Sequence, residues 1–216
     1  MNPGRRLLSA ASLCRGGDII DIGSDHGFLP VWLLLNAKCE SASASDINPM
    51  PLERCRKTAE KYGVAKDMRF FLSDGFDNVE GVYDAAFVCG MGGIMIADII
   101  RRAPQRAALW VLQPMTNAEI LRAFLWDTGY AVTDEVYTVE KRKPYAVIAA
   151  EYVGIKTPYS YSDTYLGKVR PKSAEYAQYV RKALASAQKR LMGKKRENAD
   201  TSCEEQLIEE CVRHIS

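Results

Sequence analysis

DIIDIGSDHGFLP, residues 18–30, joins an apolar strand-like run to a glycine-containing loop and then to a helix-like run. Gly23 and Gly27 allow a tight turn and let a ligand approach the backbone, because neither residue has a side chain. A loop of this kind, directly after a strand, is typical of nucleotide-binding α/β folds. Asp25, however, stands where a dinucleotide-binding loop has its second glycine, and His26 follows it. The stretch predicts a strand, a ligand-binding loop and a helix, with an unusual acidic residue in the loop.

The size and composition of the chain allow one substantial core. With 216 residues and 47% apolar content, the chain can bury a large interior and a small additional unit. It has no run of about 18 apolar residues, so we expect no membrane span. Its six cysteines form no CxxC pair and it has two histidines, so we expect no bound metal, no disulfide framework and a cytoplasmic location. The first residues predict a short amphipathic helix rather than a signal peptide.

Apolar runs alternate with amphipathic stretches through the first 153 residues. The strand-like runs are 18–23, 41–47, 68–74, 83–90 and 108–114, and the helix-like stretches are 28–37, 51–62, 93–102 and 117–128. This alternation predicts βαβ units and a parallel, doubly wound sheet. Two further β-rich runs, 130–140 and 145–153, leave no room for a crossover helix and predict an antiparallel hairpin. The predicted fold class is α/β: five parallel strands plus a terminal antiparallel hairpin, a pattern that resembles the Rossmann-like sheet of class I S-adenosylmethionine-dependent methyltransferases.

The chain divides into two parts of different character, 1–154 and 155–216. The second part begins with a linker-like segment rich in Gly, Pro, Ser and Tyr. Residues 154–216 carry 12 basic and 8 acidic side chains, against 17 and 19 in residues 1–153. This asymmetry predicts two functional units, of which the second faces something anionic.

Two apolar stripes at helical spacing follow the linker. Residues 173–192 carry one stripe and 202–215 carry the other, which predicts a coiled-coil-like, basic helical hairpin. Gly193 is expected to end the first helix. Ser202 and Glu205 have the spacing of a capping box, which is expected to begin the second helix.

The charge of the loop separates two classes of nucleotide ligand. A pyrophosphate is anionic, and Asp25 would repel it at the position meant to contact it. S-adenosylmethionine carries a sulfonium and an ammonium group, so nearby carboxylates are tolerated or favoured. Asp21, two residues before Gly23, matches the acidic residue that is usual in methyltransferase loops. We therefore expect S-adenosylmethionine at Asp21, Gly23, Ser24, Asp25 and Gly27; the alternative is that Asp25 merely caps the next helix.

Two further strand ends carry an acidic residue. Asp46 ends the second strand, roughly twenty residues beyond the loop, where a carboxylate accepts hydrogen bonds from ribose hydroxyls; a helix cap is the alternative. Asp74 ends the third strand and is expected to accept from an adenine amino group, with Gly75 allowing close approach; a plain turn residue is the alternative. The predicted cofactor contacts at these two ends are Asp46, Ile47, Asp74 and Gly75.

The fourth and fifth strands end in a glycine-rich and an amide-containing sequence. GMGG, which begins at Gly90, leaves a gap at the carboxyl edge of the sheet, where open α/β folds bind their ligands. We expect Gly90, Met91 and Gly92 to contact the cofactor and a flat base to enter beside them; a simple turn that opens the next helix is the alternative. LQP brings the amide of Gln113 to the same rim.

These motifs together indicate a narrower family. DIGSDHGFLP, GMGG and LQP in this order, with an N-terminal RLL helix and a basic helical tail, closely resemble the bacterial tRNA (adenine-N1)-methyltransferases that modify position 22. The resemblance covers essentially the whole chain. Its most specific element is the GSDHG loop, and the tail matches only in kind. It implies transfer of a methyl group from S-adenosylmethionine to N1 of an adenine, with tRNA as the partner.

The residue types are consistent with that chemistry. Neutral adenine N1 exposes a lone pair at pH 7, so no general base is required, and in-line positioning in a dry pocket can supply most of the catalysis. The [DN]PPY motif of exocyclic-amine methyltransferases is absent from the sequence. The expected catalytic residues are Asp25 or His26, near the methyl donor, and Gln113, near the base. A plain helix-start role for His26 is the alternative.

Other residues would hold the tRNA. An adenine inside a folded tRNA must be exposed, often with aromatic stacking, and Tyr145 at the hairpin is the candidate; a buried core tyrosine is the alternative. Residues 168–196 contain ten basic side chains and one glutamate, and each phosphate contact adds a salt-dependent increment. The alternative is that these basic side chains only form a solvent-exposed face and contact no phosphate. The candidate substrate-binding residues are Gln113, Pro114, Tyr145, Lys172, Arg181, Lys182, Lys189 and Arg190.

Two other functions stay open from the sequence. The same fold can methylate a protein or a small molecule, with the basic hairpin as a partner-binding or dimerising arm. It can also bind RNA without transferring a methyl group, although the intact cofactor loop argues against this, because a silent module needs no cofactor pocket. A dinucleotide oxidoreductase is disfavoured by the charge of the loop. The oligomeric state does not follow from the sequence, and a monomer is the default expectation.

Overall fold

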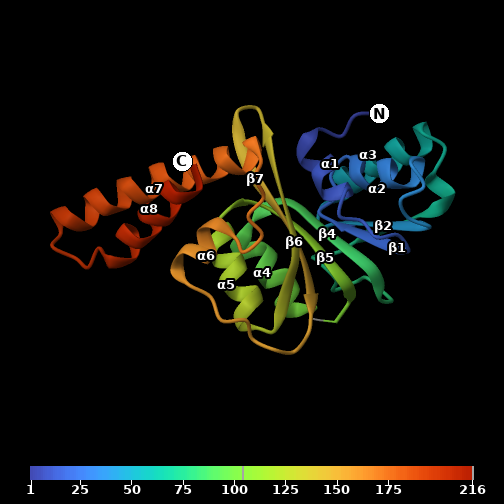
Figure 1. Ribbon diagram of the computed structural model, residues 1–216. Coiled ribbons are helices and arrows are strands. Elements are labelled where there is room, and N and C mark those ends of the chain that lie inside the picture. The colour runs from blue at the N-terminus through green and yellow to red at the C-terminus, as the bar shows by residue number, and fades with distance from the viewer. Residues whose placement is uncertain (104, 216) are drawn as a thin grey trace.

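The computed structural model describes residues 1–103 and 105–215, which fold around a twisted seven-stranded sheet (Figure 1). The strands are β1 (Asp18–Ile22), β2 (Ser41–Asp46), β3 (Met68–Leu72), β4 (Tyr83–Gly92), β5 (Ala107–Thr116), β6 (Tyr130–Glu140) and β7 (Lys143–Tyr152). The helices are α1 (Arg5–Ala11), α2 (Phe28–Leu35), α3 (Pro49–Lys61), α4 (Gly93–Arg102), α5 (Ala118–Asp127), α6 (Tyr161–Leu166), α7 (Ala174–Arg196) and α8 (Ser202–Ile215), with a short 3-10 helix, η1 (Ala65–Asp67).

The strand order is β3-β2-β1-β4-β5-β7-β6. The first five strands of this order pair in parallel, and β7 is antiparallel to both β5 and β6. The predicted five parallel strands with a terminal hairpin are therefore confirmed. The direction in which strands are added reverses between β1 and β4, and such a switch point opens a crevice at the carboxyl ends of the strands.

Helices cover both faces of the sheet with apolar side chains. On one face α4 and α5 pack through residues such as Ile96, Ile100 and Leu121. On the other face α1, α2 and α3 pack through residues such as Leu29 and Leu33. Because both faces are buried, the central strands read as continuous apolar runs instead of alternating ones.

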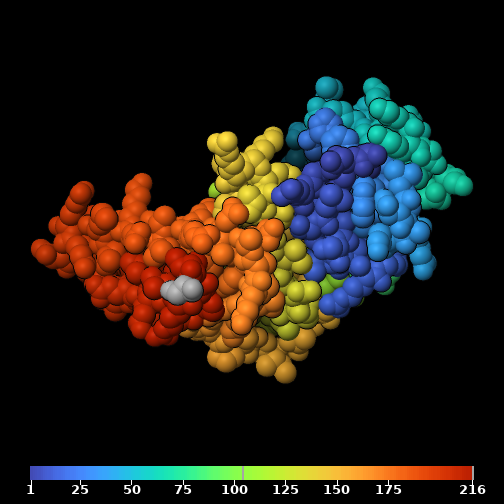
Figure 2. Space-filling model, turned by 45° about the horizontal axis from the view of Figure 1, so that its top comes forward, coloured from blue at the N-terminus to red at the C-terminus, as the bar shows by residue number. Residues whose placement is uncertain are grey.

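The C-terminal helices form a third apolar cluster with the hairpin. Residues of α6, α7 and α8 pack against Tyr137 of β6 and Ala146 of β7. Figure 2 shows α7 and α8, in orange and red, projecting from the rest of the molecule. We call these two helices the arm. The predicted helical hairpin at the end of the chain is confirmed, and its last residue, Ser216, lies outside the described residues.

A buried ion pair anchors the arm. Arg122 Nε of α5 lies 2.7 Å from a carboxylate oxygen of Glu135 on β6, and both side chains are fully buried. The same guanidinium donates to the carbonyl of Thr164 in α6 and to the hydroxyl of Tyr179 in α7. The Tyr137 hydroxyl donates to the second oxygen of Glu135. These directional contacts connect α6 and α7 to the sheet.

Three local predictions are wrong. Gly193 does not end α7, which continues beyond it, because glycine costs a helix only about 1 kcal/mol and basic side chains suit the last turn. Ser202 is the first residue of α8 and not its cap; its N–H and hydroxyl both donate to the Asp200 carboxylate. The linker-like segment holds α6, which starts with a capping box between Ser160 and Asp163.

Candidate active site

A cavity of about 410 Å³ lies at the switch point of the sheet, where β1 and β4 end. We call it the switch-point cavity. Much of the predicted cofactor loop and the start of the GMGG motif line this cavity, together with residues of α1 and the segment before it. The lining residues are Pro3, Arg6, Leu7, Asp21, Gly23, Ser24, Asp25, His26, Phe28, Leu29, Cys89, Gly90 and Met91.

The loop after β1 is tight because two glycines adopt a left-handed backbone. Gly23 and Gly27 have φ angles of 73° and 68°. A side chain at Gly23 would collide with Met91 Cε, and one at Gly27 would collide with Cys55 Sγ on α3. The N–H groups of Gly23 and Ser24 both donate to one carbonyl of β2, which holds the loop in place. Gly23 therefore keeps the cavity floor open, and Gly27 brings α2 close to α3.

Asp21 is a buried carboxylic acid at the floor of the switch-point cavity. The residue is 5% exposed, and burial, reinforced by the charge of Asp46, raises the pKa of Asp21 to about 8. No cation from the described residues offsets these two effects. A ligand that brings positive charge into the cavity would favour the ionised carboxylate. The floor of the cavity is therefore suited to a cation.

Asp25 and His26 lie at the exposed mouth of the cavity. Asp25 has a φ of 42°, and its carboxylate lies 2.6 Å from the guanidinium of Arg54 on α3. The His26 ring stacks on Phe28 with ring centroids 5.2 Å apart, and its Nε2 lies 3.6 Å from the Asp25 carboxylate. Gly27 is the N-cap of α2. The alternative that Asp25 caps this helix is therefore wrong.

Asp46 ends β2 beside the loop, and its two oxygens differ. Oδ1 accepts a hydrogen bond of 2.9 Å from the N–H of Asn48, at the start of α3. Asn48, and not Asp46, is the N-cap of α3, so the alternative of a helix cap is wrong. Within the described residues, Oδ2 accepts no hydrogen bond, so it can accept one from a ligand. The neighbouring Ile47 side chain is 62% exposed and offers apolar surface at the same strand end.

Asp74 lies in an exposed ion cluster outside the switch-point cavity. Its carboxylate lies 3.0 Å from the Arg102 guanidinium on α4, which also pairs with Asp77 and Asp98. Gly75 turns the chain with a φ of 58°. The structure is consistent with the turn alternative for Asp74, and its assignment to an adenine amino group stays a prediction.

Gln113 is fully buried at the carboxyl edge of the sheet. Its Oε1 accepts hydrogen bonds from the N–H of Gly90, at 3.1 Å, and from the Arg6 guanidinium of α1. Its Nε2 donates to the Pro114 carbonyl at 3.0 Å. Arg6 also pairs with Glu140 of β6 at 3.0 Å; burial would raise the pKa of Glu140, but the bonds from Arg6 lower it below its ordinary value. The network therefore joins α1 to the ends of β4, β5 and β6.

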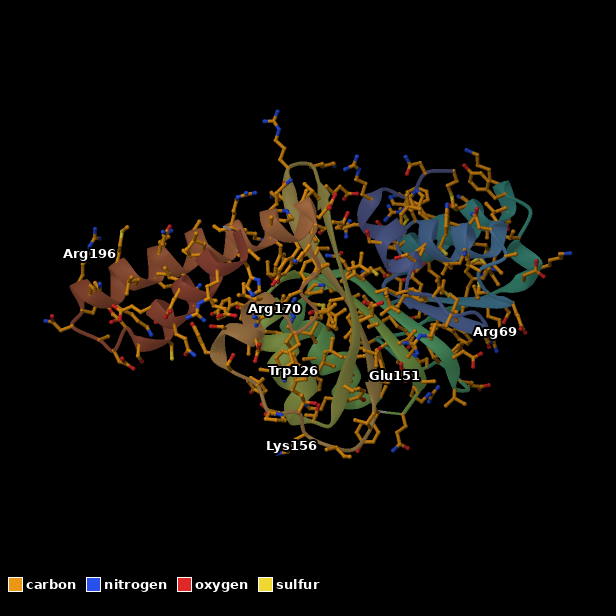
Figure 3. The ribbon with its side chains drawn as sticks, in the orientation of Figure 1. Arg69, Trp126, Glu151, Lys156, Arg170 and Arg196 are labelled. Atoms are coloured by element: carbon orange, nitrogen blue, oxygen red, sulfur yellow. The ribbon has the colours of Figure 1, made fainter. Side chains whose placement is uncertain are left out.

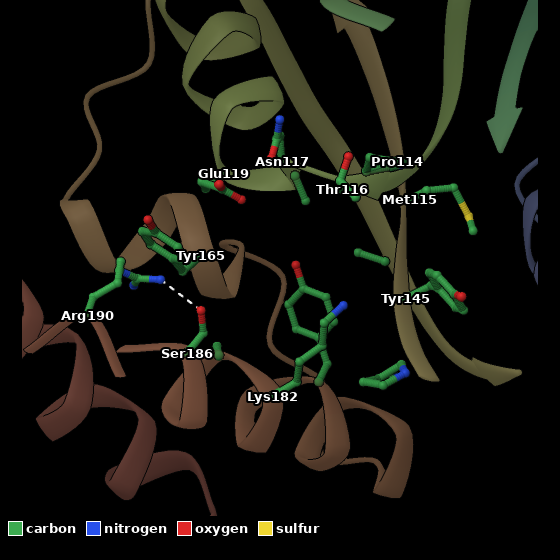
Figure 4. A pocket seen from close by; sticks show the side chains of 15 residues that line it. Pro114, Met115, Thr116, Asn117, Glu119, Tyr145, Tyr165, Lys182, Ser186 and Arg190 are labelled. Atoms are coloured by element: carbon green, nitrogen blue, oxygen red, sulfur yellow. Dashed lines mark hydrogen bonds between the residues drawn. The ribbon is translucent and has the colours of Figure 1, made fainter. Parts of the chain in front are cut away.

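A second cavity, of about 240 Å³, lies between the sheet edge and α7 (Figure 4). We call it the arm cleft. Four of the predicted substrate-binding residues meet there: Pro114, Tyr145, Lys182 and Arg190. The other lining residues are Met115, Thr116, Asn117, Ala118, Glu119, Pro144, Ala146, Tyr165, Tyr179, Ala183 and Ser186.

The two cavities share a wall. Arg6 lines the switch-point cavity and Tyr145 lines the arm cleft, and Arg6 Cζ lies 5.8 Å from the centroid of the Tyr145 ring. Lys182 Nζ also lies 5.8 Å from that centroid. Tyr145 is 8% exposed, so the alternative of a buried tyrosine is right, while its ring still contacts the cations of both cavities.

The remaining predicted substrate-binding residues lie outside the arm cleft. Lys172 is exposed in the segment before α7, and Arg181 and Lys189 are exposed on α7 itself. These three cations are accessible to a large polyanion but do not line either cavity. Gly92 precedes α4 as its N-cap, in agreement with the alternative of a turn that opens this helix.

Two site residues carry no motif that marked them in the sequence. Ser186 stands four residues from both Lys182 and Arg190, a spacing that is visible in the sequence. Arg6 has no such signal, because its contact with Gln113 depends on how α1 packs across the sheet. Helical spacing could therefore have found the first residue but not the second.

Two kinds of feature are missing from the described part of the chain. No group of three or more His, Cys, Asp or Glu side chains there is arranged to hold a metal ion. None of the helices described combines the length and apolarity that a membrane span requires.

Comparisons of the sequence identify relatives. A family model described as a methyltransferase domain matches residues 4–148. The tRNA (adenine(22)-N(1))-methyltransferase of Bacillus subtilis (strain 168) is 34% identical over 152 residues. The matched region covers 68% of this chain and 64% of that relative, a little under two thirds of its length.

Solved structures match along nearly the whole chain. The crystal structure of the B. subtilis m1A22 tRNA methyltransferase TrmK is 28% identical, with a TM-score of 0.79, and the match covers 99% of this chain and 96% of that one. The structure of M. capricolum TrmK in complex with S-adenosylhomocysteine is 25% identical, with a TM-score of 0.82, over 98% of this chain and 96% of that one. The chain therefore belongs to the class I methyltransferases and, within them, to the TrmK-like family.

Proposed function

We propose that this protein transfers the methyl group of S-adenosylmethionine to N1 of adenine 22 in tRNA. The B. subtilis relative is named for this activity, and M. capricolum TrmK holds the product of the cofactor. The observation that carries the proposal is the pairing of two cavities. An acidic cavity at the switch point lies beside a basic cleft, and the two share the wall formed by Arg6 and Tyr145.

The switch-point cavity fits S-adenosylmethionine. When bound, this cofactor supplies an electrophilic methyl group on a sulfonium. Asp21 would face its positive charge, and Gly23 would allow the close approach of the cofactor to the loop backbone. Oδ2 of Asp46 would accept from the ribose hydroxyls. The remaining proposed cofactor contacts are Ser24, Asp25, Gly27, Ile47, Asp74, Gly75, Gly90, Met91 and Gly92.

Methylation of adenine N1 needs no general base. The N1 lone pair forms the new bond to carbon while the carbon–sulfur bond breaks, and the products are S-adenosylhomocysteine and a cationic 1-methyladenine. No proton has to be removed. The protein therefore contributes orientation and the exclusion of water. We assign Asp25 and His26 to the mouth of the cavity beside the methyl donor. Gln113 is fully buried and lines neither cavity, so we assign it to holding Arg6 in the wall that positions the base.

We propose that residues 155–216 form a tRNA-binding unit on the catalytic unit 1–154. The exposed cations of the segment before α7 and of α7 itself, Lys172, Arg181 and Lys189, would contact phosphates of the tRNA body. Such contacts bind nucleic acid without reading its sequence and weaken as salt rises. The arm would therefore contribute affinity, and the cavities would contribute the choice of base.

Methylation of an unmodified tRNA transcript tests the proposal. With S-adenosylmethionine present, mass spectrometry of the digested tRNA is expected to find one methyl group, on N1 of adenine 22. A transcript with guanine at position 22 is the control and should stay unmethylated. Methylation at an exocyclic amine, at another position, or only of a protein or small molecule would contradict the proposal.

A further inference from the structure

We propose that the arm cleft binds one nucleotide unit of the RNA strand beside the target adenosine, with its phosphate on α7 and its base against the tyrosines. The inference rests on the proposed function, because it names the site that holds the RNA next to the reacting base. The occupant is defined by chemistry: an anionic phosphodiester joined to a flat aromatic ring.

One side of α7 supplies the phosphate-binding groups. Lys182, Ser186 and Arg190 are spaced by four residues, so they lie on the same side of the helix. All three line the arm cleft, as Figure 4 shows. Arg190 Nη1 donates to the Ser186 hydroxyl at 2.9 Å, while Arg190 Nη2 has no hydrogen-bond partner within the described residues. Ammonium, hydroxyl and guanidinium groups are the side-chain donors that phosphates take.

The positive charge of the cleft is only partly neutralised. Glu119 is the one acidic residue in its described lining, and Arg190 Nε lies 3.5 Å from Glu204 of α8. Desolvation and the charge of Lys143 lower the pKa of Lys182, against the opposing effect of Glu119. A phosphate beside Lys182 and Arg190 would offset both the lost solvation and the repulsion.

The rest of the cleft suits a nucleobase. Tyr165, which is half-buried, contributes aromatic surface, with smaller areas from Tyr145 and Tyr179, each 8% exposed, and bases of single-stranded RNA stack on such rings without regard to sequence. Thr116 and Asn117, at the start of α5, add polar groups at the edge. The volume of about 240 Å³ lies below the range of roughly 300–1,000 Å³ that is usual for drug-sized ligands. The cleft therefore limits its occupant to at most one nucleotide unit and excludes a duplex.

The position of the cleft relates this nucleotide to the target. The wall of Arg6 and Tyr145 separates the cleft from the switch-point cavity, so a strand that occupies both has adjacent units on either side of that wall. Holding the neighbour in the cleft would keep the target adenine out of its stack. Exposure of the base and its presentation to the cofactor would then depend on the same residues.

Methylation kinetics of Lys182→Met test the site. Methionine keeps the length and apolar contacts of the side chain but removes the charge. We expect the KM for tRNA to rise about tenfold, with the dissociation constant for S-adenosylmethionine unchanged, and the slope of log(kcat/KM) against log salt to fall by about 0.7–0.9. Lys66→Met is the matched control, since Lys66 is exposed in η1 beside β3, at the opposite edge of the sheet from the hairpin against which α7 packs. If Lys182→Met behaves like Lys66→Met, the proposal is wrong.

A binding experiment separates this proposal from the proposed function. Cytidine 5′-monophosphate, cytidine and inorganic phosphate, which lack the adenosine of the cofactor, are titrated into the wild-type protein and Lys182→Met by calorimetry, without tRNA. We expect the nucleotide to bind the wild type at least tenfold more tightly than either fragment, and this advantage to disappear in Lys182→Met. Equal binding of nucleotide and nucleoside by the wild type would overturn the cleft proposal, whatever the methylation assay gives. Nucleotide binding without any tRNA methylation would instead overturn the proposed function alone.

Discussion

The switch-point cavity and the arm cleft are suited to ligands of opposite charge. Asp21 and Asp25 line the first, and Arg6, the one arginine in its described lining, is already bonded to Gln113 and Glu140. Lys182 and Arg190 line the second, with a single acidic residue among its described lining. A cationic cofactor, which favours ionised Asp21, and an anionic RNA strand would therefore each be favoured on a different side of one wall. The charged side chains of each lining therefore indicate which ligand it suits, without reference to the shape of the cavity.

The two cavities also differ in how they are built. About half of the lining of the switch-point cavity comes from one short stretch, residues 21–29, and the rest from α1, the segment before it and the end of β4. The arm cleft needs α7, which is tied to the sheet by the buried pair of Arg122 and Glu135. The first cavity follows from a local motif, while the second depends on contacts between distant segments.

Removing the anchor of the arm is expected to have the largest effect. Arg122→Met leaves Glu135 buried without its partner, so the free energy of unfolding should fall by about 3–5 kcal/mol. Urea denaturation followed by circular dichroism measures this loss. The double variant Arg122→Met/Glu135→Leu removes both charges and should recover most of the stability. A loss of less than about 1 kcal/mol for the single variant would show that the pair does not hold the arm.

The pH dependence of cofactor binding tests the role of Asp21 in the switch-point cavity. The folded-state pKa of Asp21, about 8, lies above the ordinary value of about 3.9, so the folded protein holds a proton that the unfolded chain loses. The contribution of Asp21 to the stability of the ligand-free protein should therefore be greatest below pH 4 and fall as the pH rises towards 8. Binding of a cation favours the ionised form, so affinity for S-adenosylmethionine should rise about tenfold per pH unit up to pH 8.

Asp21→Asn is the matching variant for this profile, because it keeps the shape of the side chain and removes the titration. Calorimetry between about pH 6 and pH 8.5 should give weaker binding whose affinity varies little with pH. A wild-type affinity that is flat over the same range would contradict the assignment of Asp21 to the positive part of the cofactor.

A smaller effect is expected at the shared wall. Arg6→Met removes the donor that fixes Gln113 but leaves the N–H of Gly90 in place. Because displacement of a positioning group lowers the rate more than it lowers binding, kcat should fall about tenfold while the KM for tRNA changes less than about threefold. Arg6→Lys should restore part of the rate. If kcat/KM falls only because KM rises, with kcat unchanged, the wall binds RNA without positioning it.

The sheet could be predicted because its signals are local. Alternating apolar and amphipathic runs defined every strand, and the absence of a crossover helix between 130–140 and 145–153 defined the hairpin. The floor of the switch-point cavity followed for the same reason, since Asp21, Gly23 and Gly27 lie within the seven residues 21–27.

The arm cleft could be predicted only in part, because it depends on tertiary contacts. Lys182 and Arg190 were visible as a basic stripe, but Arg122 and Glu135 read as ordinary polar residues of a helix and a strand. Their burial follows from the packing of α6 and α7 over them, and α6 itself lies in a segment whose composition is typical of linkers. Arg6 was likewise hidden, since it meets Gln113 only after α1 folds across the sheet.

The length of α7 has a consequence for which nucleotide is modified. The helix runs unbroken from the arm cleft at Lys182 to Arg196 near the far end of the arm (Figure 3). At about 1.5 Å per residue, the two cations are held roughly 20 Å apart along the helix axis. A tRNA that rests on the tip of this helix would then deliver to the reaction centre whichever nucleotide lies at that set distance. The protein would select the nucleotide by its distance from the tip of α7, and the bases around the target could vary freely.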